Sequence, residues 1–219
     1  MEKVLDLKNT ENYDKLDKIA EVLKNGGIVA FPTETVYGIG ADCLNEEAIK
    51  KLYRVKKRPL DNPISLLVSN VDMIENVVEK VNDVEYKLIK AFFPGPLTLV
   101  IKKKKIISNI LTANLENVGI RMPNNEIAIR LIEYLNMPIA TTSANISGNP
   151  SGTSVEDVIQ EFGEKIDYYI DGGKSKIGKG STVAQVMEDG SINIIREGSI
   201  TLEQMLEAIK TKNSLDKSR

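Results

Sequence analysis

The chain of 219 residues contains no histidine. The absence of an imidazole excludes Ser-His-Asp and Cys-His nucleophilic catalysis, and it excludes the common His-ligated zinc and non-haem iron sites. Any chemistry therefore depends on lysine, arginine, hydroxyl, amide, carboxylate and backbone groups. These groups suit the binding of phosphates and the stabilisation of charge in phosphoryl or nucleotidyl transfer, in which the metal ion arrives with the nucleotide.

The chain also has a single cysteine, no long apolar run and a small net charge. Cys43 is the single cysteine, which excludes an internal disulfide and a thiolate zinc site. No run approaches the roughly 18 apolar residues of a membrane-spanning helix, and the N-terminal segment lacks the apolar stretch of a signal peptide. We therefore expect a cytoplasmic protein without a membrane partner. With 29 basic and 31 acidic residues the net charge is −2, so any attraction for nucleic acid must come from a local basic surface.

Helical and strand patterns alternate along the whole chain. Helical spacing and capping residues predict helices at 10–25, 45–58, 70–81, 83–92, 125–135, 154–162 and from 201 onward. Apolar runs predict strands at 28–31, 64–68, 97–101, 118–122, 139–142, 168–171, 181–186 and 192–196, the last two as a hairpin. This interleaving predicts a mixed α/β or α+β domain over residues 1–210, with a central sheet of about seven strands and a polar tail at 211–219.

Two loops that follow predicted strands are rich in small and hydroxyl residues. The segment FPTETVYGIGAD, residues 31–42, is one, and TTSANISGNPSGTS, residues 141–154, is the other. Backbone N–H groups and hydroxyls in such loops surround phosphate or ribose oxygens in many α/β proteins. The alternative is an ordinary connection in each case, since Gly38 and Gly40 do not complete a Walker or dinucleotide motif.

Basic residues point to two further candidate positions. The stretch from Lys50 to Arg58 is strongly basic and runs into an irregular connection that ends at Pro63. It is either a solvated helix surface, with Arg54 and Arg58 on one face and Lys56 pointing elsewhere, or the holder of basic groups at a cleft. Arg121 lies among apolar residues of a predicted strand, so it requires either a carboxylate ligand or an internal acidic partner.

The ordered segments FPTETVYGIGAD, KKRPLDNPISLLV, FFPGPLTLV, VGIRMP, TTSANISGNPSGT and GKGSTV resemble the YrdC-type threonylcarbamoyl-AMP synthases over about residues 12–200. The resemblance implies a twisted mixed α/β sheet with flanking helices around a positively charged concave cavity. It also implies condensation of L-threonine, bicarbonate or CO2, and ATP into threonylcarbamoyl-AMP and pyrophosphate, with Mg²⁺. A downstream tRNA threonylcarbamoyl-transferase complex would use the product at position 37 of ANN-decoding tRNAs.

The same resemblance implies roles for thirteen residues. The KxR and SxN elements, Lys56 with Arg58 and Ser143 with Asn145, would hold the ATP phosphates and the reacting centre. The further nucleotide contacts would be Asn62, Asn117, Ser151 and Arg196. L-Threonine would contact Thr35, Leu67, Arg121, Thr141 and Ser181, with Arg121 on its carboxylate. Many relatives carry histidine where this chain has Leu67, which removes one polar contact to threonine. No protein-held metal site is implied.

Two alternatives use the same resemblance. A related domain occurs in carbamoyltransferases that form carbamoyl-adenylate, but the single Cys43 cannot supply the Cys-rich zinc module of those proteins. The other alternative is a module that binds double-stranded RNA, which the net charge of −2 does not favour. Its binding would weaken steeply as the salt concentration rises.

Overall fold

The computed structural model describes residues 3–8 and 13–210. The strands are β1 (Val4–Asp6), β2 (Val29–Phe31), β3 (Gly38–Asp42), β4 (Ser65–Leu67), β5 (Leu97–Lys102), β6 (Asn117–Arg121), β7 (Ile139–Ser143), β8 (Tyr168–Asp171), β9 (Thr182–Val186) and β10 (Ile192–Arg196). Within the described ranges they form one mixed sheet in the order β1-β8-β2-β3-β7-β4-β6-β5-β9-β10. The predicted tail and residues 10–12 of the first predicted helix lie outside these ranges.

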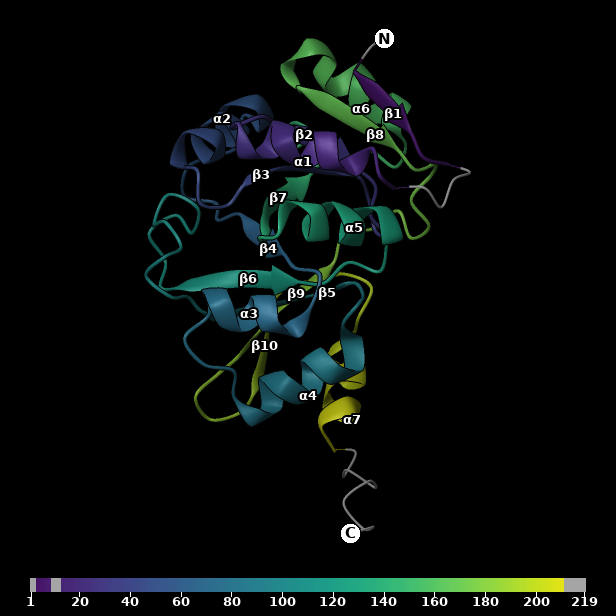
Figure 1. Cartoon of the computed structure of the whole chain (residues 1–219). Coiled ribbons are helices and arrows are strands. Elements are labelled where there is room, and N and C mark those ends of the chain that lie inside the picture. The colour runs from purple at the N-terminus through teal and green to yellow at the C-terminus, as the bar shows by residue number, and fades with distance from the viewer. Residues whose placement is uncertain (1–2, 9–12, 211–219) are drawn as a thin grey trace.

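The helices lie around this sheet. They are α1 (Leu16–Lys24), α2 (Glu46–Lys56), α3 (Val71–Val77), α4 (Asp83–Phe92), α5 (Glu126–Leu135), α6 (Val155–Phe162) and α7 (Leu202–Lys210), with a short 3₁₀ helix at Gly163–Lys165. Helix α1 packs on α5 and contacts β2 and β3, whereas α6 contacts β2 and β8 (Figure 1). Helices α4 and α7 pack together at the end of the molecule opposite to β1. In the described chain, the structure contains no helix with the length and apolar character needed to cross a bilayer.

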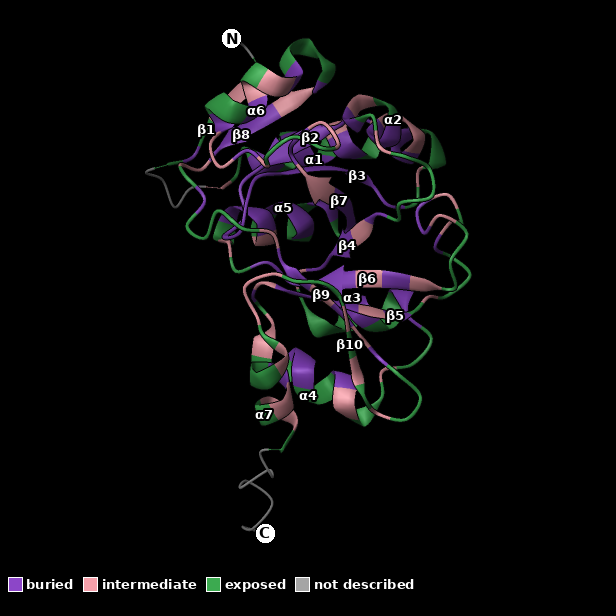
Figure 2. Ribbon diagram, turned by 180° about the vertical axis from the view of Figure 1, so that it is seen from behind, coloured by how far each residue is buried: buried purple, intermediate pink, exposed green. Residues whose placement is uncertain are grey.

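The core lies along the central strands. Every residue of β2 and β3 is buried, and Figure 2 shows buried residues gathered along the sheet while exposed residues lie on the outer sides of the helices. The apolar faces of the amphipathic helices α1 and α5 close this core. The predicted α/β class is therefore confirmed.

The eight predicted strands and the β9–β10 hairpin are confirmed, but the expected number of strands is too low. Strand β3 occupies part of the segment predicted as a loop, and β1, which pairs in parallel with β8, had no prediction. The sequence GIGAD of β3 has few strand-favouring residues, so its extended form depends on pairing with β2 and β7. Sequence periodicity cannot reveal a strand that its neighbours impose.

The end of α2 also differs from the prediction. The helix ends at Lys56, because Lys57 adopts a left-handed conformation with φ of 51°. Arg58 therefore lies outside the helix and does not share a helical face with Arg54. Lys56 is 2% exposed, so the solvated-surface interpretation is wrong for that residue. Helix α3 ends at Val77 and is shorter than predicted.

Candidate functional site

A cavity of about 500 Å³ lies over one face of the sheet. Paired residues of neighbouring strands share a face, and residues two apart on a strand share it as well. The register pairs Gly38 with Ser143, Ser65 with Thr141, Leu67 with Arg121, Val100 with Gly119, and Thr98 with Val183. These pairs line the cavity, so strand pairing alone gathers residues from six segments into one site.

The structure brings together eleven of the thirteen predicted site residues. The residues that line the cavity are Thr35, Arg58, Asn62, Leu67, Asn117, Arg121, Thr141, Ser143, Ser151, Ser181 and Arg196. The other two, Lys56 and Asn145, do not line it. They are buried, and both hydrogen-bond to Ser143.

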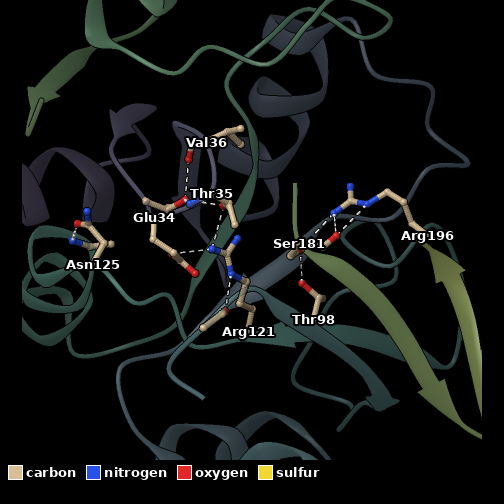
Figure 3. Close-up of polar contacts among 11 residues, drawn as sticks. Glu34, Thr35, Val36, Thr98, Arg121, Asn125, Ser181 and Arg196 are labelled. Carbon is tan, nitrogen blue, oxygen red and sulfur yellow. Dashed lines mark hydrogen bonds and ion pairs between the residues drawn. The ribbon is translucent and has the colours of Figure 1, made fainter. Parts of the chain in front are cut away.

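Arg121 lines the cavity and is 7% exposed. Its Nη2 donates to Thr35 Oγ1 at 2.9 Å and lies 2.8 Å from Glu34 Oε2, while its Nε donates to the carbonyl of Gly95 at 3.1 Å (Figure 3). Arg121 therefore has the internal acidic partner that the sequence left open, and it also faces the cavity. Of the two alternatives for Arg121, the internal acidic partner is therefore confirmed, and the carboxylate ligand stays a prediction.

Glu34 was missed as a functional residue. Its carboxylate is 7% exposed, and neither oxygen has a well-aligned hydrogen bond among the described residues, although Oε2 forms the ion pair with Arg121. The signal was present in the PTET segment, where an acidic residue directly precedes the hydroxyl of Thr35. Sequence reasoning gave an internal acidic partner as one of two alternatives for Arg121 but had no means of choosing which residue it would be.

Arg196 and Ser181 form a second group at the cavity wall. Arg196 Nη2 donates to the carbonyl of Ser181 at 2.8 Å, and the hydroxyls of Ser181 and Thr98 lie 2.8 Å apart (Figure 3). A register irregularity between Ile194 and Arg196 places Arg196 opposite Val183, on the cavity face. Sequence reasoning also missed Thr98. It lies two residues from Val100 on β5, so both side chains face the cavity.

Arg58 is held at the cavity by the connection after α2. Its Nε donates to the carbonyl of Asn62 at 2.9 Å, and its Nη2 donates to that of Pro63 at 2.8 Å. Burial lowers the pKa of Arg196, and so do the nearby cations Arg121 and Arg58. Arg196 is thus close enough to Arg121 and to Arg58 for each of them to repel it, and an anion bound beside Arg196 would relieve this repulsion. No acidic residue of the described chain lines the cavity.

A second hollow, of about 620 Å³, lies on the outer side of α5. It is lined by Tyr13, Asp14, Glu126, Arg130, Glu133 and Tyr134. Arg130 is already paired there with Glu126 and Glu133, and none of the predicted site residues lines this hollow. We place the candidate site in the cavity over the sheet, although it is the smaller of the two. The hydroxyls are there, and so are Arg58 and Arg196, which form no ion pair with any described residue.

The chain is similar to known proteins of one family. A family model described as "Telomere recombination", covering Sua5, YciO and YrdC, matches residues 21–198. A threonylcarbamoyl-AMP synthase of Pyrococcus abyssi is 42% identical over 89% of this chain and 57% of its own length. A putative threonylcarbamoyl-AMP synthase of Methanocaldococcus jannaschii is 40% identical over 93% of this chain and 95% of its own length. The chain spans little more than half of the Pyrococcus relative and nearly all of the Methanocaldococcus one.

The fold has a solved counterpart. The crystal structure of P. abyssi Sua5 complexed with L-threonine superimposes with a TM-score of 0.91 and 39% identity, over 94% of this chain and 61% of that one. The sequence match and the structural match cover the same mixed sheet and its flanking helices. On both grounds, the chain belongs to the Sua5, YciO and YrdC family.

Proposed function

We propose that this protein is a threonylcarbamoyl-AMP synthase, which condenses L-threonine, bicarbonate or CO2, and ATP into threonylcarbamoyl-AMP and pyrophosphate. Two relatives that cover most of this chain carry that name, one of them as putative. One observation carries the proposal. A single cavity is lined by three arginines, Arg58, Arg121 and Arg196, together with threonine and serine hydroxyls.

The chemistry requires orientation and charge stabilisation more than acid or base catalysis. The amine of threonine forms a carbamate with CO2, and a carbamate oxygen then attacks the α-phosphorus of ATP while pyrophosphate leaves. Holding the two reactants in line converts their encounter into an intramolecular step. Fixed cations and hydroxyls stabilise the negative charge that develops on the phosphates. A site without histidine can meet both requirements.

We propose that Arg121, Thr35, Thr141, Ser181 and Leu67 form the threonine pocket. Arg121 would bind the substrate carboxylate through a charge-assisted pair, and Leu67 would supply apolar contact to the side chain. The remaining lining arginines, with the amides and hydroxyls of Asn62, Asn117, Ser143 and Ser151, would hold the nucleotide. The excess of arginines over acidic residues on the lining would give the cavity the positive charge that a triphosphate needs.

We propose that Mg²⁺ arrives with ATP and is not a resident metal. In the part of the chain that the structure describes, no three His, Cys, Asp or Glu side chains gather to hold a metal ion. Hydroxyl and amide oxygens line the cavity instead, and such hard neutral donors fit a magnesium ion held mainly by phosphate oxygens. When bound, the ion would neutralise charge on the phosphates.

We propose that residues 1–210 act as one catalytic domain in the cytoplasm, where ATP and tRNA are found. The product would pass to a downstream tRNA threonylcarbamoyl-transferase complex for modification of position 37. Direct binding of double-stranded RNA is the competing proposal. A filter-binding titration tests it, because an RNA module would bind tightly at low salt and lose affinity steeply as salt rises.

Pyrophosphate release with ATP and bicarbonate, measured with and without L-threonine, tests the proposed activity. We expect release to depend on both threonine and bicarbonate, with threonylcarbamoyl-AMP as the second product by mass spectrometry. Carbamoyl phosphate serves as the competing substrate. Release that occurs only with carbamoyl phosphate would assign the chain to the carbamoyltransferase type and overturn the proposal.

A further inference from the structure

The side chain of Lys56 lies beneath the cavity and not in it. Its Nζ donates to the carbonyl of Ser143 at 2.6 Å, to the carbonyl of Asn145 at 2.8 Å and to Asn145 Oδ1 at 3.2 Å, and it lies 3.4 Å from Ser143 Oγ. An ammonium group has three N–H donors. Protein acceptors therefore occupy all the donors of Lys56, and none is left for a phosphate. The backbone carbonyl of Lys56 also accepts from the N–H of Ser147 at 3.0 Å. Lys56 therefore binds the loop after β7 through both its side chain and its backbone.

Asn145 connects Lys56 to both Ser143 and Ser151, whereas Lys56 itself bonds only to Ser143 of these two cavity-lining residues. Asn145 Oδ1 also accepts from Ser143 Oγ at 2.6 Å and from Ser151 Oγ at 3.3 Å. Its Nδ2 donates to the carbonyls of Ile146 and Asn149, both at 2.9 Å, which fixes the plane of the amide. Ser143 and Ser151 line the cavity, whereas Asn145 does not. The orientation of both hydroxyls is therefore set from below, by an amide that Lys56 holds in place.

Stability alone does not account for a lysine at this position. Among the described residues no carboxylate lies within ion-pair distance of Lys56, and a buried cation without such a partner is costly. Burial lowers the pKa of Lys56 to about 7, with the cations Arg58 and Arg196 adding to the effect and Glu161 opposing it. A buried methionine of similar length would avoid this cost. The cationic group therefore contributes something other than packing.

We propose that Lys56 is a positioning residue, which acts through Asn145 to aim the hydroxyls of Ser143 and Ser151 at the nucleotide phosphates. This inference rests on the proposed function, because it assumes that the cavity binds ATP. It differs from the direct phosphate contact that the family resemblance implies for Lys56. A direct contact would require Nζ to break at least one of its bonds to Ser143 and Asn145 and to turn into the cavity.

A double-mutant cycle distinguishes the positioning role of Lys56 from a direct contact between Lys56 and the phosphates. The variants are Lys56→Met, Asn145→Ala and their combination, with Lys57→Met as the control, because Lys57 is exposed and does not line the cavity. We expect Lys56→Met to lower kcat by about 10²-fold, the scale of losing oriented charge stabilisation, while the KM for ATP changes less than about threefold. We expect the double variant to be no worse than the more damaging single variant, since both changes remove the same support.

Two kinetic outcomes would overturn the proposal. One is multiplication of the two single losses in the double variant, which would show that Lys56 and Asn145 act independently. The other is a rise in the KM for ATP in Lys56→Met as large as that in Arg58→Ala, which would indicate a direct nucleotide contact. Lys57→Met is expected to match the wild type in both kcat and KM.

A crystal structure of the wild-type protein with a non-hydrolysable ATP analogue tests the proposal without any variant. We expect Nζ of Lys56 to keep its bonds to both carbonyls, with no phosphate oxygen within about 3.5 Å. A phosphate oxygen bonded to Nζ would overturn the positioning role. A wild-type enzyme that binds the analogue but releases no pyrophosphate with threonine would contradict the proposed function only, and a protein that binds no nucleotide would contradict both.

Discussion

The side chain of Arg121 both forms contacts within the protein and lines the cavity. Its Nη2 lies 2.8 Å from Glu34 Oε2 and donates to Thr35, yet the residue also lines the cavity. A substrate carboxylate at Arg121 would share the guanidinium with Glu34, and two carboxylates around one cation repel each other. The affinity for a carboxylate substrate therefore depends on both members of the ion pair.

Arg121→Ala is expected to weaken L-threonine binding by about 2–4 kcal/mol while ATP binding changes much less, because a desolvated guanidinium–carboxylate pair is lost. Isothermal titration calorimetry with each ligand measures this difference. Glu34→Gln is the matched variant. It disrupts the internal ion pair but leaves the guanidinium in place, so threonine affinity should be kept or increased. Unchanged threonine affinity in a folded Arg121→Ala protein would make Arg121 a structural residue only.

Arg58 and Lys57 are neighbours in sequence with different environments. Arg58 lines the cavity, whereas Lys57 is exposed at the end of α2. Arg58→Ala is expected to lower turnover by roughly 10²-fold or more, the effect of losing a preorganised charge near the phosphates. Lys57→Ala should leave turnover unchanged, as most exposed substitutions do. Initial rates of pyrophosphate release compare the two, and equal small effects would remove Arg58 from the site.

At the scale of the element, β3 depends on small residues. The strand runs between β2 and β7, and all of its residues are buried. A Cβ on Gly40 would lie 2.5 Å from Ile139 Cγ2, 3.0 Å from Phe31 Cε1 and 3.2 Å from Thr141 Oγ1. These three neighbours, which come from both adjoining strands, would have to move. The glycine therefore allows β2 and β7 to pack closely against β3.

Gly40→Ala is expected to lower the free energy of unfolding by about 1–3 kcal/mol, the range for overpacking a well-packed core. Urea denaturation followed by circular dichroism measures the change. Gly180→Ala is the control, since the nearest atoms to its Cβ would be those of Arg196 at 3.5 and 3.7 Å. It should alter stability by less than about 1 kcal/mol. Similar losses in the two variants would contradict the packing argument for β3.

At the scale of the molecule, one sheet carries segments from nearly the whole described chain. Strand β1 lies at one edge and β10 at the other, and the cavity is lined by residues from β3 through to β10 in the sheet order. Cys43 directly follows β3 and is 1% exposed. Burial, together with Asp42, raises the pKa of its thiol to about 12. The single thiol is therefore a reporter on opening of the central sheet.

Cys43 is expected to react with an aromatic disulfide reagent at pH 8 at least roughly 10³-fold more slowly in the native protein than in urea, because reaction requires the core to open. Absorbance of the released thiolate follows the reaction. Gly40→Ala should accelerate native labelling by the factor that its loss of stability predicts, about tenfold per 1.4 kcal/mol. Rapid labelling of the native wild type would show that the strand region opens without global unfolding.

The sequence alone determined the local elements and the chemical type of the site. Helical spacing and capping residues located the helices, and apolar runs located eight strands. The lack of histidine excluded imidazole chemistry, and the family resemblance carried by the ordered motifs picked out eleven of the residues that line the cavity. These features depend on neighbouring residues or on residue identity, so they can be deduced without a fold.

The tertiary structure decided which distant residues come into contact and which polar groups already have hydrogen-bond or ion-pair partners within the protein. Strand β3 exists because β2 and β7 pair with it, and Glu34 was identifiable as the partner of Arg121 only once strands far apart in sequence were placed side by side. Likewise Lys56 lies beneath the cavity because the helix ends there and the loop at Ser143 and Asn145 closes over its ammonium group. Contacts between distant segments depend on sheet register and burial, which residue patterns along one segment do not encode.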